Sequence, residues 1–179
     1  MPVMSQAPRY CPQQPLPPYS YVTGLAPHPT RDPAGHSFGR HEARPPPLDE
    51  ANFRDNPAYL FGLDLFNHGF YWEAHEEWES LWHAAGRKGA AADVLKGLIK
   101  LAAAGVKARE GRAEGVRRHA RRAEELLRPA HQGGRQHCFG LFLEDLIGAA
   151  QSIAASADSL AGDGRADATR RLPLTLRLE

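Results

Sequence analysis

Features that would assign a function at once are missing from this 179-residue chain. Only two cysteines occur, Cys11 and Cys138, and they lie far apart in no metal-ligating spacing. The pair does not fit a disulfide-stabilised scaffold, and it fits the reducing environment of the cytoplasm. No apolar run approaches the ~20 residues of a membrane span, and the N-terminus lacks the basic region and apolar core of a signal peptide. We therefore expect a cytoplasmic protein without a membrane partner.

An excess of charge of one sign is missing as well, because the formal net charge is only +1. A molecule this close to neutrality has no overall attraction to nucleic acid or membranes. Arg117, Arg118, Arg121 and Arg122 form a local cluster, but two glutamates follow directly, which favours a solvated helical face over a nucleic-acid patch. The sequence also shows no glycine-rich phosphate loop, no Ser-His-Asp constellation and no nucleophilic cysteine context.

Proline is scarce in most of the chain and concentrated in its first part. Twelve of the fifteen prolines fall within residues 1–47, a density that excludes helix interiors and central strands. One interpretation is a disordered leader. We favour an extended strap on the helical domain, because Tyr19, Tyr21 and Val22 supply more apolar surface than a linker needs. The predicted division is a leader over residues 1–47, a helical domain over 48–160 and a tail over 161–179.

Hydrophobic periodicity in the rest of the chain predicts helices. Asn56 can cap a helix whose first position is Pro57, and Gly69 ends it. Apolar residues recur at helical spacing through four further stretches, each followed by glycine or proline. Short connections make the first helices antiparallel. The sequence thus predicts an all-α, antiparallel bundle of about five helices, at residues 57–68, 70–85, 90–109, 113–127 and 138–160.

The most distinctive stretch is residues 70–83, which hold all three tryptophans, two histidines and four glutamates. On a helix, Trp78 falls on the apolar face, whereas Glu73 and Glu77 fall opposite and are expected to meet water. His75 and Glu79 are four residues apart and therefore share one side of the helix. The flank between the two faces carries Trp72, His75, Glu76, Glu79 and His83.

A run of residues in this helix and its neighbours resembles a known family. The run consists of Leu63, Phe66, Asn67, Gly69, Tyr71, Ala74, His75, Glu76, Glu79 and Trp82, followed by residues 95–104. It is similar to the Domain of Unknown Function 309 family, a small all-helical bundle, over about residues 58–127. The resemblance implies the fold and implies no activity. Its motif positions here are His75, Glu76, Glu79 and Trp82, and many members have glutamine in place of Lys96 and Lys100.

The polar flank favours a binding or scaffold module whose ligand is a small molecule or a peptide. Aromatic and ionisable side chains that converge beside an apolar face are typical of such pockets, and the leader can close one. A purely structural seam is the alternative, in which Glu76 or Glu79 pairs with Lys96 or Lys100 of the next helix. The predicted ligand-binding residues are Trp72, His75, Glu76, Glu79, Trp82 and Lys100.

A metal-dependent enzyme is a further interpretation of the same flank. In zincins, His-Glu-x-x-His places two ligands one helical turn apart and uses the glutamate as a base. Here His75-Glu76-x-x-Glu79 has a carboxylate in the second ligand position, and leader histidines at 28, 36 and 41 can approach. A divalent ion would be held by His75, Glu79 and His83, with Glu76 as the catalytic candidate of a hydrolase-like reaction. Because the ligand set is incomplete, we rank this hypothesis second. The sequence indicates no particular oligomeric state.

Overall fold

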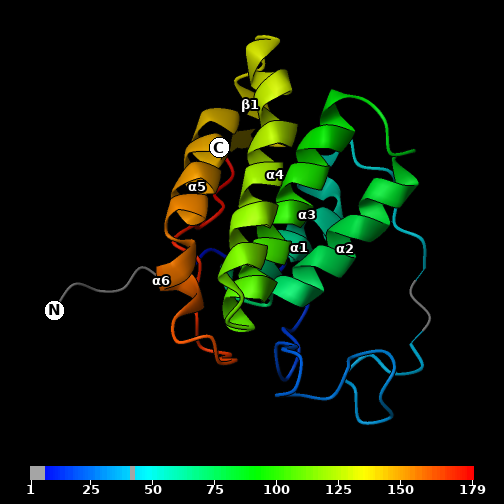
Figure 1. Cartoon of the computed structure of the whole chain (residues 1–179). Coiled ribbons are helices and arrows are strands. Elements are labelled where there is room, and N and C mark those ends of the chain that lie inside the picture. Colours follow the sequence, from blue (N-terminus) through cyan, green and yellow to red (C-terminus); the bar gives the residue numbers. More distant parts are fainter. Residues whose placement is uncertain (1–6, 41–42) are drawn as a thin grey trace, which may run out of the picture.

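The computed structural model describes residues 7–40 and 43–179, and these form a bundle of helices (Figure 1). The only sheet within these ranges is one antiparallel pair of two-residue strands. The predicted all-α fold is therefore confirmed. The elements in chain order are η1 (Phe53–Asp55), α1 (Pro57–Asn67), α2 (Tyr71–Ala84), α3 (Ala90–Arg109), α4 (Ala113–Gln132), β1 (His137–Cys138), β2 (Leu141–Phe142), α5 (Leu143–Ala155) and α6 (Ala157–Ala161).

Helix α1 begins where the sequence predicts, because Asn56 and Pro57 supply complementary parts of a helix start. The Asn56 side chain accepts a hydrogen bond from the backbone N–H of Tyr59 at 3.1 Å. Pro57 occupies the first helical position, where no N–H is needed. The helix ends at Asn67, and Gly69 turns the chain with a φ of +84°, in the region that glycine tolerates. Helix α2 therefore starts close to the end of α1.

Helix α3 lies between α2 and α4 (Figure 1), and two of its glycines contact side chains of these neighbours. A Cβ added at Gly105 of α3 would lie 2.4 Å from the ring of Tyr71 in α2. A Cβ added at Gly97, nearer the other end of α3, would lie 2.9 Å from the Leu127 side chain in α4. Neither site has room for a side chain, so these glycines let α3 approach both neighbours closely.

Helix α4 is longer than the sequence predicts. It runs to Gln132 and includes Pro129 in its last turns, so the predicted end near residue 127 is wrong. Proline cannot donate to the carbonyl four residues earlier, but its own carbonyl still accepts from the N–H of Gly133 at 2.9 Å. A missing hydrogen bond is tolerated here because the hydrogen-bond ladder ends within the next turn.

The predicted helix over residues 138–160 is wrong at its start and is interrupted near its end. Phe139 and Gly140 have φ values of +51° and +75° and form a tight turn between β1 and β2. The Tyr59 hydroxyl donates a hydrogen bond to the Phe139 carbonyl at 2.8 Å, and this contact with α1 overrides the local helical pattern. The helical conformation therefore begins only at Leu143, and the chain bends again between α5 and α6.

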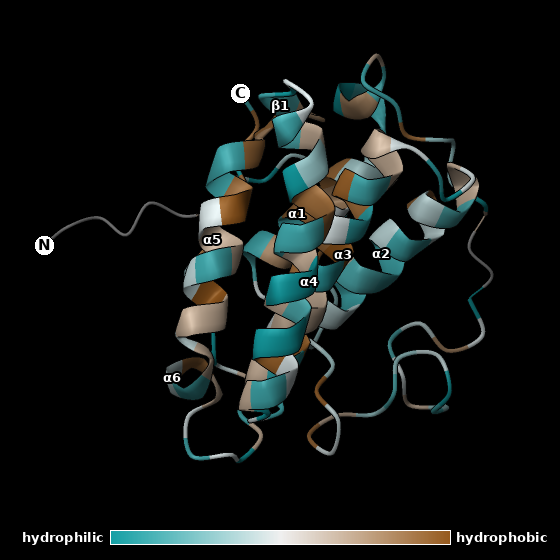
Figure 2. Cartoon of the chain, turned by 45° about the horizontal axis from the view of Figure 1, so that its top comes forward, coloured by the Kyte–Doolittle hydropathy of each residue, from teal (hydrophilic) through white to brown (hydrophobic). Residues whose placement is uncertain are grey.

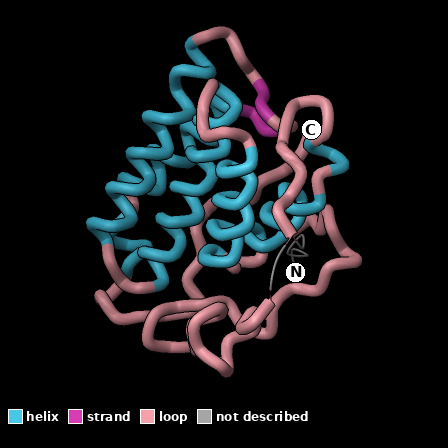
Figure 3. The backbone as a smooth tube through the Cα atoms, turned by 90° about the vertical axis from the view of Figure 1, so that its right-hand side faces the viewer, coloured by secondary structure: helices cyan, strands magenta, loops and turns pink. Residues whose placement is uncertain are grey.

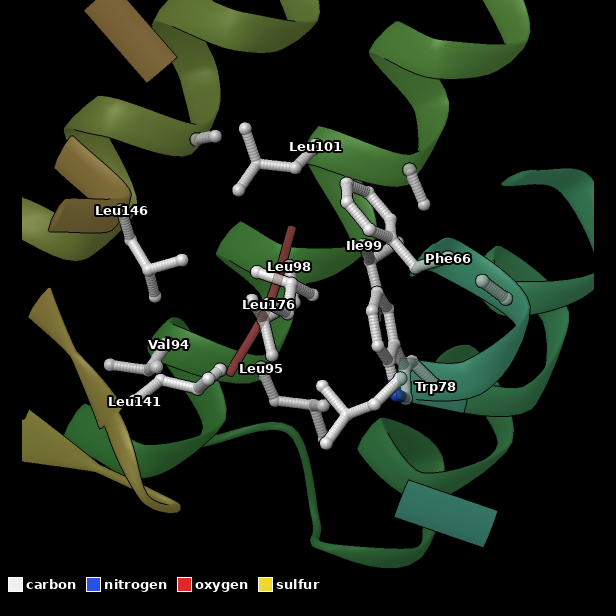
Figure 4. Packing of buried hydrophobic residues seen from close by; sticks show 14 of the residues in the cluster. Phe66, Trp78, Val94, Leu95, Leu98, Ile99, Leu101, Leu141, Leu146 and Leu176 are labelled. Atoms are coloured by element: carbon white, nitrogen blue, oxygen red, sulfur yellow. The ribbon is translucent and has the colours of Figure 1, made fainter. Parts of the chain in front are cut away.

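The hydrophobic core lies between the helices and includes residues from the C-terminal segment (Figure 4). The rings of Trp78 and Phe66 pack with centroids 5.9 Å apart, and both side chains are buried. Leu176 is also buried, and its backbone exchanges two hydrogen bonds with the Asn67 side chain, at 2.7 and 2.8 Å. Figure 2 shows that α4 carries many hydrophilic residues among its apolar ones.

The described residues of the leader, 7–40 and 43–47, follow the bundle as extended chain and turns (Figure 3). Asp64 of α1 is 0 % exposed, and it accepts hydrogen bonds from the Arg9 side chain and from the backbone N–H groups of Tyr10 and Cys11 at 2.6–2.9 Å. Val22 is buried. The Tyr19 hydroxyl instead bonds within the leader, to the Pro27 carbonyl. The division into leader, domain and tail stays a prediction.

None of the helices in residues 7–40 and 43–179 combines the length and the apolar character that a membrane span requires.

Candidate functional site

Two flanks of helix α2 carry most of the predicted site residues, together with Glu73, which the sequence analysis places on the water-facing side. The leader flank, consisting of Trp72, Glu73 and Glu76, borders a cavity beneath the leader. The α3 flank, consisting of His75 and Glu79, lies beside helix α3. Glu76 lies between the two and contacts His75 as well. The predicted site is therefore distributed over two neighbouring surfaces.

The leader flank centres on Glu73, which is only 5 % exposed. The prediction that Glu73 meets water is therefore wrong. Its carboxylate accepts a hydrogen bond from the backbone N–H of Tyr21 at 2.8 Å and lies 3.1 Å from Nε2 of His36. The His36 side chain is equally buried, at 6 % exposure. A buried carboxylate is stable only with such partners, so Glu73 fixes the leader on α2.

Arg109 extends this contact to the end of α3 and to the tail. Its guanidinium donates hydrogen bonds to the Ser20 hydroxyl at 2.8 Å and to the Arg170 carbonyl at 3.0 Å. Ser20 in turn donates to the Gly69 carbonyl. Burial lowers the pKa of Arg109 from its ordinary value, and the nearby Tyr71, Glu73 and Asp167 act in the opposite direction. The leader is therefore anchored through polar groups from three parts of the chain.

Trp72 forms the aromatic part of the leader flank. Its ring meets those of Tyr21 and His28 edge to face, with centroids 5.4 Å away in each case. Beside it lies a cavity of about 440 Å³, bounded by α1, α2 and the leader. The residues that give the cavity its chemical character are His36, Arg40, Phe61, Trp72, Glu73 and Glu76. His75, Glu79, Trp82 and Lys100 are not among its lining residues.

The α3 flank brings an imidazole and carboxylates together. Nδ1 of His75 lies 3.2 Å from Oε1 of Glu76 and 4.0 Å from Oε2 of Glu79. The potential ligand atoms of the three residues all lie within 4.8 Å of one another. Their side chains are 25 %, 50 % and 34 % exposed, respectively. The group is therefore open to solvent and has the donor types that divalent transition metals accept.

Lys96 of α3 pairs with one of the two carboxylates of this group, that of Glu79. Its Nζ lies 3.4 Å from Oε1 of Glu79 and 3.8 Å from the centroid of the Trp82 ring. The predicted pairing of a glutamate on this flank with a lysine of the next helix is confirmed for Glu79 and Lys96. Trp82 thus acts as a cation–π partner of Lys96.

The remaining predicted ligands lie elsewhere. His83 is exposed and lies outside the group of three, with its ring 5.4 Å from that of Trp82. His28 and His36 belong to the leader flank, and His41 lies outside the described residues. Lys100 is half-buried on α3 one turn from Lys96, and its pKa is lowered by burial, by Lys96 and by arginines of α4.

His119 of α4 is a notable residue that the sequence analysis did not select. Its pKa is lowered from 6.5 to about 4, first by burial and then by the charges of Lys100 and Arg118. The imidazole is therefore neutral at physiological pH. One sequence signal was available, because His119 lies three residues after Val116 and four before Ala123, which places it at the edge of the apolar face of α4. The sequence around Glu73 contains no such signal, because the residues that cover Glu73, Tyr21 and His36, lie far away in sequence.

The fold and these contacts define the class of protein: a small helical bundle with an imidazole–carboxylate group on one helix and a strapped leader beside it. Residues 59–119 match the family described as Domain of unknown function (DUF309). The match confirms the resemblance found in the sequence, over α1, α2, α3 and the first part of α4. No curated protein and no solved structure matches the chain. The matched segment contains both flanks of α2 but not the leader that covers one of them.

Proposed function

We propose that the protein binds a small molecule or a short peptide in the cavity between α2 and the leader. The observation that carries this proposal is a cavity of about 440 Å³ with aromatic and carboxylate walls, within the ~300–1,000 Å³ range typical of small-ligand sites. Prolines 15, 17 and 18 form part of the opposite wall. Their restricted backbone keeps that wall in place without a bound ligand.

The lining favours a ligand with an apolar body and a positively charged group. Three glutamates border the cavity, Glu73, Glu76 and Glu77, whereas Arg40 is the one arginine or lysine among its lining residues. Glu73 is already engaged by the leader, and half-exposed Glu76 is the better partner for an amine. A second hollow of about 590 Å³ shares lining residues with the first. The pair can therefore accommodate an extended chain as well as a compact ligand.

A matched pair of probes tests this proposal. The full chain is titrated with 2-phenylethylamine and with 3-phenylpropionate, and the indole N–H resonance of Trp72 is followed by NMR. We expect saturable shifts with the amine and much weaker ones with the acid. Ser80→Phe, which fills the cavity from α2, should abolish the shifts, whereas Ser152→Phe on the exposed side of α5 should preserve them. Absence of binding, or equal binding by Ser80→Phe, would contradict the proposal.

The second candidate function is a divalent-metal site with hydrolase-like chemistry. Its support is the convergence of His75, Glu76 and Glu79 within 4.8 Å. His75 and Glu79 would hold the ion, and Glu76 would accept the proton of an attacking water. The ion would supply Lewis acidity to that water. Lys96 opposes this arrangement, because it already pairs with Glu79.

Metal titration separates this candidate from the cavity. Calorimetric titration with Zn²⁺ should show one site, which Glu79→Gln removes and Glu144→Gln, an exposed change in the first turn of α5, leaves intact. Lys96→Met should strengthen binding, because it removes the competing cation. Glu76→Gln should retain the metal but lose hydrolysis of p-nitrophenyl esters. Binding that survives Glu79→Gln unchanged would refute the assignment.

A cytoplasmic location remains part of the proposal. Cys11 and Cys138 are both free and buried, which suits a reducing compartment. Thiol titration of protein purified from its native host, with and without denaturant, checks this directly.

A further inference from the structure

The cavity and the second hollow adjoin each other beside helix α2. They share three lining residues, Gln14, Glu77 and Ser80, and contain about 440 and 590 Å³, respectively. The leader borders both, because it supplies Pro15 to the first and Pro45 to the second. We call the two spaces together the α2 groove. A ligand longer than either space can lie along α2 and occupy both.

One row of side chains on α2 runs through the α2 groove. Glu76 lines the cavity, His83 lines the second hollow and Ser80 lines both. Spacings of four and three residues place these three on the same face of the helix. At a rise of ~1.5 Å per residue, Glu76 and His83 lie about 10 Å apart along the helix axis. The groove therefore has two ends, each with an ionisable group of α2.

Helix α1 contributes an apolar row to the same groove. Ala58 borders the second hollow, whereas Phe61 and Leu65 border the cavity. Their spacings of three and four residues again define one helical face. The short connection between α1 and α2 makes the two helices antiparallel, so this apolar row lies alongside the polar row of α2. An extended ligand would meet charged groups at its ends and apolar atoms along its middle.

The two ends of the α2 groove differ in charge. Of the acidic and basic residues that line only the cavity, α2 supplies two glutamates and the leader an arginine and a histidine: Glu73, Glu76, Arg40 and His36. Glu73 and His36 contact each other, and the most exposed glutamate is Glu76. Arg44 and His83 are the residues of this kind that line only the second hollow. Neither lies within ion-pair distance of a carboxylate in residues 7–40 and 43–179. The Glu76 end therefore suits a cation, and the Arg44 end suits an anion.

We infer that the α2 groove binds a tripeptide with free termini in an extended conformation, an inference that rests on the proposed function of the cavity. An extended chain advances ~3.3 Å per residue, so three residues match the spacing of about 10 Å between the two ends. The N-terminal ammonium group pairs with Glu76. The C-terminal carboxylate accepts paired hydrogen bonds from the guanidinium of Arg44 and one N–H from His83. The central side chain packs toward the apolar row of α1, which favours an aliphatic residue at that position.

Peptides that differ in one terminal charge test this inference. The full chain is titrated calorimetrically at pH 7 with Ala-Leu-Ala, with its C-terminal amide and with its N-acetylated form. Each modification removes one charge, and we expect each to weaken binding about tenfold or more, as for the loss of one charge-assisted contact. Equal affinity for the free peptide and its amide would overturn the inference. Tighter binding of Gly-Gly-Ala-Leu-Ala-Gly-Gly would also overturn it, because the groove would then accept the interior of a longer chain.

Substitutions locate the carboxylate end of the ligand. Arg44→Gln should weaken binding of free Ala-Leu-Ala about tenfold more than binding of its amide, because the amide has no carboxylate to lose. Arg44 is exposed, so its replacement should have little effect on folding. Arg177→Gln is the matched control, since Arg177 is also exposed and lines neither space. A similar loss in both variants would indicate only general charge attraction and would refute the site.

The compact amine 2-phenylethylamine separates a failure of this inference from a failure of the proposed function. Its size and single charge require only the cavity. Saturable binding of this amine, together with equal affinities for Ala-Leu-Ala and its amide, would leave an amine site and overturn the tripeptide. Absence of binding by both the amine and the peptide would overturn the two proposals together.

Discussion

Each of the two flanks of helix α2 has a glutamate beside a histidine, but the flanks differ in what covers them. On the leader flank, Glu73 and His36 form a buried contact that the backbone of Tyr21 completes. On the α3 flank, His75 and Glu79 form a similar contact that remains partly exposed. The first contact fixes a long segment of chain, whereas the second leaves its side chains accessible to solvent. Whether a histidine–glutamate contact is buried or accessible to solvent thus depends on which segment of the chain packs over it.

The largest expected difference between the flanks comes from removing one glutamate on each. Glu73→Ala would leave the Tyr21 N–H and the buried His36 side chain without their acceptor, and we expect a loss of about 3–5 kcal/mol in unfolding free energy. Glu79→Ala removes a partly exposed pair and should cost less than about 1 kcal/mol. Urea unfolding of both variants measures the contrast, and proteolysis within residues 20–40 reports release of the leader. Equal losses would contradict the distinction between the flanks.

His119, which lies beside the α3 flank, should make the unfolding free energy depend on pH. Its pKa is about 4 in the folded protein, against 6.5 ordinarily. The unfolded chain therefore takes up a proton between pH 6.5 and 4 that the folded chain does not. Stability contributed by neutral His119 is fully present above pH 6.5 and declines as pH falls to 4, by at most about 3 kcal/mol.

The matched variant for this effect is His119→Gln. It should show a shallower fall in unfolding free energy between pH 6.5 and 4 than the unsubstituted protein, as measured by chemical denaturation at several pH values. An identical pH profile would mean that His119 is not desolvated among Lys100 and Arg118.

Asp64 provides a second measure of how firmly the leader is held. Asp64→Asn places an amide N–H₂ where a carboxylate oxygen accepted from Arg9 and Cys11, and we expect a loss of about 2 kcal/mol. Asp145→Asn on the exposed surface of α5 serves as the control and should change stability by less than about 0.5 kcal/mol. Thermal unfolding compares the two, and similar values would show that residues 9–11 of the leader contribute little to stability.

The smallest effect concerns the pair that joins α2 to α3. A double-mutant cycle with Glu79→Gln and Lys96→Met should give a coupling of about 0.2–1 kcal/mol. Because the pair is partly exposed, the coupling should decrease as salt is added. A larger, salt-independent coupling would show that this flank is as protected as the leader flank.

Local sequence determined the helices and one part of the site. Asn56 and Pro57 define a helix start through hydrogen bonds and backbone angles within one turn. Helix α3 has the predicted bounds of 90 and 109, because its apolar spacing and flanking glycines are also local features. His75 and Glu79 approach each other for the same reason, since residues four apart meet on any helix.

The tertiary structure alone decided which side chains are covered. Glu73 is buried by Tyr21 and His36, which lie 52 and 37 residues away in sequence. Phe139 leaves its predicted helix because Tyr59, 80 residues away, bonds its carbonyl. Helical periodicity describes one element at a time, whereas burial and electrostatic environment depend on which distant segment packs against it. That is the physical reason why the sequence predicted the helices of this protein but not the different roles of the two flanks of α2.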